Sequence, residues 1–156
     1  MHGALADGGT GAVNASVGEE LPERRRVVTA ADVAVYAEAG GDRNPLHLDD
    51  AFARSVGFDG VIAHGMFTMG HMATAVTTWA GEDAVIERIT AQFRAPVSMG
   101  EEIRAGGTVR AVENDVVIID TWVSVERGGT TEWPIKKGVV ILSASRAPEP
   151  RPIPQG

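Results

Sequence analysis

The chain has 156 residues, of which 44% are hydrophobic and 22% are charged, a balance typical of one globular domain with a real core. Its formal net charge of −7 argues against a broad nucleic-acid-binding surface, because such surfaces are basic. The chain has no cysteine for a disulfide and no apolar run near the roughly 20 residues that span a bilayer, so we expect a cytoplasmic protein without membrane attachment.

The two ends of the chain differ in composition from its centre. Residues 1–15 belong to a Gly- and Ala-rich stretch without Lys or Arg, and they lack the apolar run of a signal peptide. We therefore predict a flexible N-terminal tail there. Residues 147–156 are Pro-rich and predict an extended C-terminal tail, which leaves a single domain over residues 16–146.

Two short helices are predicted in the first third of the chain. Thr29 and Asp32 have the spacing of a capping box, and apolar residues then repeat at helical spacing until Gly40-Gly41. Further on, Asp49 can cap a second short helix that stops at Gly57.

A third helix is predicted from Gly65 to about Ala80. This segment has no charged residue and carries apolar groups on nearly every side, which indicates a buried helix. Its methionines, Met66, Met69 and Met72, can fill irregular gaps in a core or line a substrate tunnel, and both alternatives stay open.

The rest of the chain alternates apolar and polar residues, most clearly from Val117 to Val125, which is typical of strands. Hairpin turns are expected at Asn114-Asp115 and at Gly128-Gly129. Pro134 predicts an edge strand or a bulge, and Gly106-Gly107 predicts a bend. Consecutive hairpins make an antiparallel sheet, so we predict an α+β fold in which the sheet wraps around the central helix.

No metal or nucleotide cofactor is expected. Cysteine is absent, and the histidines do not group with carboxylates in a recognised ligand spacing. No Gly-rich phosphate loop and no Gly-x-Ser-x-Gly nucleophile motif is found. Two basic clusters, Arg24 to Arg26 and Lys136-Lys137, are candidates for binding an acidic ligand, although solvated surface is the commoner role.

The loop from Gly41 to His47 holds the best candidates for chemistry. Asp42 and His47 lie five residues apart in Gly-Asp-Arg-Asn-Pro-Leu-His, whose Gly and Pro fix the backbone. A carboxylate and an imidazole held across one water form a suitable general acid/base pair. The alternative is that Asp42 and Asn44 bond their own backbone as turn residues, and that His47 only precedes a helix cap.

A second candidate lies in Ala63-His64-Gly65-Met66, where the third helix begins. The first amides of a helix have no internal acceptor, and the helix dipole adds positive charge there. The Gly65 amide is therefore a candidate hydrogen-bond donor to a carbonyl oxygen that gains negative charge during a reaction. The alternative is that a glycine stands here only because the turn is tightly packed. His64 can contact a substrate or a partner, although a bond to a local backbone group is the commoner role, and His71 is expected to be a core histidine.

Together, Tyr36-Ala37, the loop from Gly41 to His47 and the segment from Ala63 to Met66 resemble the signature of the MaoC-like (R)-specific enoyl hydratases and dehydratases. The later Phe93-Arg94-Ala95-Pro96-Val97 followed by Gly100 looks like that family's first strand after the helix. The resemblance covers about residues 16 to 145.

This resemblance implies a hot-dog fold, dimerisation through edge pairing into a continuous sheet, and no cofactor beyond the thioester carrier. It places Asp42 and His47 at the catalytic positions, Asn44 as an orienting residue and Gly65 at the carbonyl-binding amide. We predict Asn44, Gly65 and His64 as the substrate-binding residues. The implied activity is that of a hydro-lyase in fatty acid metabolism. It hydrates trans-2-enoyl thioesters of CoA or acyl carrier protein, or dehydrates (3R)-hydroxyacyl thioesters.

Within the family the pattern looks closest to the catalytic subunits of (3R)-hydroxyacyl-ACP dehydratases, so a homodimer or a heterodimer with a second hot-dog chain is expected. Ala73 stands where some CoA-specific hydratases carry a serine, so their detailed pocket is not carried over. The alternatives are a non-catalytic or co-catalytic hot-dog subunit, or an acyl thioesterase. The carrier, the acyl chain, the direction of the reaction, and which of Asp42 and His47 moves which proton stay open.

Overall fold

The computed structural model of the chain describes residues 13–144. Its helices are α1 Ala30–Gly40, η1 Pro45–His47 (a 3-10 helix), α2 Asp50–Ser55 and α3 Gly65–Ala80. Its strands are β1 Arg24–Val27, β2 Ala84–Thr90, β3 Glu102–Glu113, β4 Val116–Arg127 and β5 Thr130–Ala144.

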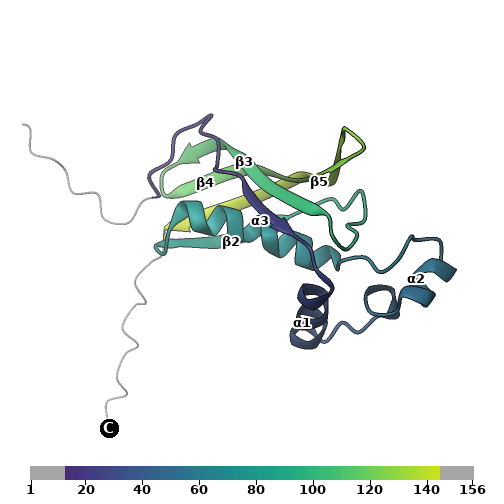
Figure 1. Cartoon of the computed structure of the whole chain (residues 1–156). Helices are drawn as coiled ribbons and strands as arrows, with labels where there is room; N and C mark the ends of the chain where they lie inside the picture. The colour runs from purple at the N-terminus through teal and green to yellow at the C-terminus, as the bar shows by residue number, and fades with distance from the viewer. Residues whose placement is uncertain (1–12, 145–156) are drawn as a thin grey trace, which may run out of the picture.

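The five strands form one antiparallel sheet in the order β1-β3-β4-β5-β2, and α3 lies along one face of that sheet (Figure 1). The predicted α+β arrangement of a sheet around a helix is therefore confirmed. Most of the predicted N-terminal tail and all of the predicted C-terminal tail lie outside the described residues. Among the described helices, none is long and apolar enough to cross a membrane.

The two short helices begin where their capping residues predict. Thr29 Oγ1 accepts a hydrogen bond from Asp32 N at 3.2 Å, and the Asp32 carboxylate accepts one from Thr29 N at 3.0 Å, which completes the capping box of α1. α1 stops at Gly41, whose φ of 71° is left-handed. Asp49 caps α2 by accepting from Phe52 N at 3.0 Å.

The core lies between α3 and the sheet. Met72 and Val76 of α3 are buried together with apolar side chains from β3, β4 and β5. A Cβ atom on Gly138 of β5 would lie 2.9 Å from Met72 Sδ, so the glycine lets the helix approach the sheet closely. The prediction that α3 is buried all round is wrong, because the sheet covers one side only and Met66 is 53% exposed.

The strand predictions hold in part. The turns occur at Asn114 and at Gly128-Gly129, all with positive φ, and the alternating residues from Val117 to Val125 point into the core. β5, which carries Pro134, lies between β4 and β2, so the predicted edge is wrong. The predicted bulge is confirmed, because the β4–β5 register shifts on both sides of Val123, which pairs with Ile135.

Gly106 and Gly107 do not bend their strand as predicted. Both residues pair in register with β4, and the irregularity falls between Val109 and Ala111. A Cβ on Gly106 would lie 2.5 Å from the Trp122 ring. These glycines are needed for close packing between neighbouring strands.

Candidate active site

The loop that carries Asp42 and His47 lies beside the N-terminal end of α3. His47 closes η1, and its Nδ1 lies 2.7 Å from the carbonyl oxygen of Ile62. A carbonyl can only accept a hydrogen bond, so Nδ1 carries a proton here. In the neutral ring, Nε2 is then left with a free lone pair and can accept a proton.

Asp42 and Asn44 also bond their own backbone, as the turn alternative predicts. Asp42 Oδ1 accepts from Asn44 N at 3.2 Å, and Asn44 Oδ1 accepts from Leu46 N at 3.0 Å, which caps η1. These bonds set the loop's conformation. The carboxylate of Asp42 can accept further hydrogen bonds, because it has several lone pairs on its two oxygens. Its role in the turn is therefore compatible with a role in proton transfer.

His64 is buried behind the loop, with 2% of its surface exposed. Its Nε2 donates to the Asp42 carbonyl oxygen at 2.9 Å, and its ring stacks on that of His47 with centroids 3.8 Å apart. The opposite nitrogen, Nδ1, is buried without a hydrogen-bond partner. His64 thus touches both members of the predicted pair, and it bonds a backbone group 22 residues away rather than a local one.

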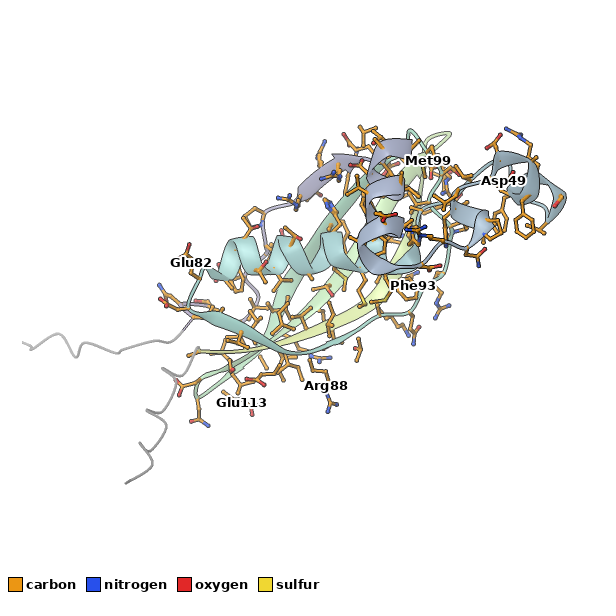
Figure 2. The ribbon with its side chains drawn as sticks, turned by 90° about the horizontal axis from the view of Figure 1, so that it is seen from below. Asp49, Glu82, Arg88, Phe93, Met99 and Glu113 are labelled. Atoms are coloured by element: carbon orange, nitrogen blue, oxygen red, sulfur yellow. The ribbon has the colours of Figure 1, made fainter. Side chains whose placement is uncertain are left out.

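A cavity of about 330 Å³ opens next to this loop. Its walls are mainly apolar and include His47, Gly65 and Phe93, whereas Asp42, Asn44 and His64 are not among the lining residues. Gly65 begins α3, and a Cβ atom there would lie 3.2 Å from the Phe93 ring. Figure 2 shows Phe93 at the same end of the molecule as Asp49, far from Glu113. His47 and Gly65, the first residue of α3, therefore line the same cavity.

Arg127, the last residue of β4, bonds the cavity wall around Pro96 to the sheet. Its guanidinium donates to the carbonyl oxygen of Pro96 at 2.7 Å, to both Glu101 oxygens at 2.6 and 2.8 Å, and to Glu132 at 2.6 Å. Hydrogen bonds from Arg127, opposed by partial burial, lower the pKa of Glu101. Sequence patterns did not reveal this cluster, because 26 residues separate Glu101 from Arg127.

Asp42, His47 and His64 are also the group best placed to hold a metal ion in the described part of the chain. One ligand atom from each lies within 4.8 Å of the others. Ligands about 2 Å from a zinc ion lie at most about 4 Å apart, so the group would have to close to bind one. That no metal is needed remains a prediction.

The other singled-out residues lie away from the cavity. His71 is buried and its Nε2 donates to the Arg24 carbonyl oxygen at 3.1 Å, which confirms a core histidine. Burial is the main cause that lowers the pKa of His71. Neither Arg24–Arg26 nor Lys136–Lys137 lines the cavity. Arg25 instead pairs with Glu23 at 3.1 Å.

Comparison with solved structures identifies the fold first. An (R)-hydratase from A. caviae involved in PHA biosynthesis superposes with a TM-score of 0.75 at 26% identity, covering 85% of this chain and 99% of that one. A chain of the ChsH1–ChsH2 complex from Mycobacterium tuberculosis, with a TM-score of 0.75 and 23% identity, shares the fold over 83% of this chain and 98% of its own. The curled antiparallel sheet around α3 is a hot-dog fold, as the resemblance implied.

The family follows from the sequence match. Residues 13–128 match the family described as MaoC like domain, so the chain belongs to the MaoC-like family. It is also similar to the 3-hydroxybutyryl-CoA dehydratase of Methylorubrum extorquens, with 40% identity over 78 residues. That match covers 49% of this chain and 50% of the relative, so the chain spans about half of the relative's length.

Proposed function

We propose that the chain is a hydro-lyase that adds water to trans-2-enoyl thioesters and removes it from (3R)-hydroxyacyl thioesters. The observation that carries this proposal is the position of His47 and the Gly65 amide on one apolar cavity, with Asp42 beside His47. The names of the relatives, a 3-hydroxybutyryl-CoA dehydratase and an (R)-hydratase, support the same reaction.

The proposed reaction needs two proton transfers and one anion-binding group. Asp42 takes a proton from a water held between it and His47, and the water oxygen bonds to Cβ of the substrate. The electron pair of the double bond moves toward the thioester carbonyl, whose oxygen accepts a hydrogen bond from the Gly65 amide. His47, protonated at Nε2 in this step, assists delivery of a proton to Cα, and the proton taken up by Asp42 then restores His47, which completes the hydration. Dehydration uses the same groups in reverse, and the division of the two protons between Asp42 and His47 stays open.

The remaining predicted site residues have supporting roles in this proposal. Asn44 orients the loop, since its side chain accepts from Leu46 N and fixes the start of η1. His64 was predicted as a substrate contact. Its burial and its hydrogen bond to the Asp42 carbonyl support a role in holding Asp42 and His47 in place. Since His64 does not line the cavity, this positioning role takes the place of the predicted substrate contact.

The carrier and the assembly are also proposals. Either CoA or acyl carrier protein can present the thioester, and no metal or redox cofactor enters the steps above. Structural neighbours include a complex of two named chains, ChsH1–ChsH2, which supports a second hot-dog chain as a partner, in a homodimer or a heterodimer. A cytoplasmic location stays a prediction.

The test is hydration of crotonyl-CoA by the purified chain, followed by loss of enoyl-thioester absorbance. Asp42→Asn should abolish most of the activity, and the matched control Asp115→Asn, in the exposed β3–β4 turn, should keep it. Chiral analysis should find the (3R) product. Release of free thiol from crotonyl-CoA without hydration would indicate a thioesterase instead. Activity only after addition of a second hot-dog chain would indicate a heteromeric enzyme.

A further inference from the structure

The cavity is lined by no acidic residue, although the chain has a formal net charge of −7. Among its lining residues are the cation Arg94 and the ionisable His47, but no Asp or Glu. The Arg94 residue is exposed to solvent, although it follows directly after Phe93, whose ring lies against Gly65. Arg94 therefore stands where the cavity meets solvent, next to the side chain that covers the proposed carbonyl site.

The backbone that carries Arg94 is fixed. Its N–H donates to the carbonyl oxygen of Pro134 at 2.9 Å, and the preceding Phe93 forms an isolated bridge with Ile135 of β5. Two residues further on, the Pro96 carbonyl is held by Arg127. A side chain on such a base can reach a ligand at the cavity mouth without the loss of backbone freedom that a mobile loop would carry.

The guanidinium of Arg94 is not neutralised by an acid. Within residues 13–144 its side chain bonds only the neutral amide oxygen of Gln92, at 2.6 Å, and forms no ion pair. Most other arginines of the described chain do pair with a carboxylate, namely Arg25, Arg26, Arg43, Arg54, Arg104, Arg110 and Arg127. Arg94 is thus the cation on the cavity that is available to an anionic ligand.

We propose that Arg94 binds the phosphate of the phosphopantetheine arm that carries the acyl thioester. This inference rests on the proposed function. That function places the thioester carbonyl at Gly65, so the phosphopantetheine group would extend from there through the cavity mouth to solvent. CoA and acyl carrier protein both present this phosphate. A guanidinium matches a phosphate with two parallel hydrogen bonds, which are stronger than bonds between neutral groups.

The test compares two substrates that differ only in this phosphate: crotonyl-4′-phosphopantetheine and crotonyl-pantetheine. Arg94→Ala should raise the KM for the phosphorylated substrate about tenfold and leave kcat nearly unchanged, as expected for a lost charge-assisted contact that does not change during the reaction. Its KM for crotonyl-pantetheine should stay at the wild-type value. Arg110→Ala, a surface arginine paired with Asp120 at 3.2 Å, is the matched control and should change neither KM.

Crotonyl-CoA and crotonyl-acyl carrier protein separate the two sources of the phosphate. Arg94→Ala should weaken both substrates, because both contain the same phosphate. An equal KM increase for crotonyl-pantetheine, no increase for the phosphorylated substrate, or a loss confined to crotonyl-CoA would overturn the proposal. These results differ from failure of the proposed function, in which wild type would hydrate none of the four substrates.

Discussion

Two regions of the molecule are held together in different ways. We call α3 with strands β2 to β5 the body, and the segment from α1 to α2, residues 30–55, the arm. In Figure 1, α1 lies beside the N-terminal end of α3 and α2 lies beyond that end. The body contains fully buried large side chains, including Ile103, Ile119, Ile135 and Leu142. In the arm only three residues are buried: Val33, Ala37 and Ala53.

Several polar contacts join the arm to segment 61–64, which leads into α3, and Val33 of α1 is part of the core. Ile62 N donates to the Leu46 carbonyl at 3.3 Å, and His47 Nδ1 donates to the Ile62 carbonyl at 2.7 Å. His64 Nε2 binds the Asp42 carbonyl, and Val61 N donates to Asp50 Oδ1 at 3.1 Å. Stability should therefore depend mainly on the body, whereas the geometry of the proposed acid/base pair should depend on these few polar contacts.

A core substitution gives the largest expected change in stability. Ile119→Ala removes a fully buried side chain from β4 and should lower the free energy of unfolding by about 2–5 kcal/mol, because it leaves a cavity. The rate per folded molecule should stay near wild type. Chemical denaturation and kinetics at a temperature where the variant is folded measure both, with the partly exposed Val112→Ala as control. A small loss of stability would contradict the division between body and arm.

The Glu101–Arg127 pair should link stability to pH. Its hydrogen bonds lower the folded-state pKa of Glu101 from 4.5, so the stabilisation is complete above that value and is lost as the pH falls through the folded pKa. Glu101→Gln should cost about 2 kcal/mol at neutral pH and flatten the acid side of the profile. Urea unfolding at neutral and acidic pH, with the exposed Glu113→Gln as control, measures this. A variant profile parallel to that of wild type would refute the assignment.

Substitutions of His64 should affect activity more than stability. His64→Phe keeps a ring to stack on His47 but loses the donor to the Asp42 carbonyl, so we expect kcat to fall about tenfold, equivalent to about 1.4 kcal/mol. His64→Gln keeps a donor and should recover part of this loss. Steady-state kinetics and thermal unfolding of both variants test the idea. Equal kcat values in wild type and His64→Phe would contradict the proposal that His64 positions Asp42 and His47.

Local signals in the sequence predicted much of the fold. The capping box of Thr29 and Asp32, the Asp49 cap and the two hairpin turns depend on neighbouring residues, and all were confirmed. β1 was missed, because it is four residues long and begins with three arginines. β1 is held in the sheet by backbone hydrogen bonds to β3, and its side chains show no alternation of apolar and polar residues that would predict a strand.

The candidate site was predictable to a similar extent. The spacing of Asp42 and His47, and the glycine that begins α3, identified residues that do lie close together. The stacking of His64 on His47 and the hydrogen bonds to segment 61–64 could not be predicted, because they join residues 11 or more positions apart. Such contacts arise from tertiary packing and leave no periodic trace in the sequence.

The most direct test of the account is a double-mutant cycle on Asp42 and His47 with crotonyl-CoA as substrate. Asp42→Asn and His47→Gln should each lower kcat by about a hundredfold or more without loss of folding, as measured by thermal unfolding. Because the two residues act on one water as a pair, the double variant should be scarcely slower than the slower single variant. Losses that multiply in the double variant, or a near-wild-type rate in either single variant, would contradict the proposed pair.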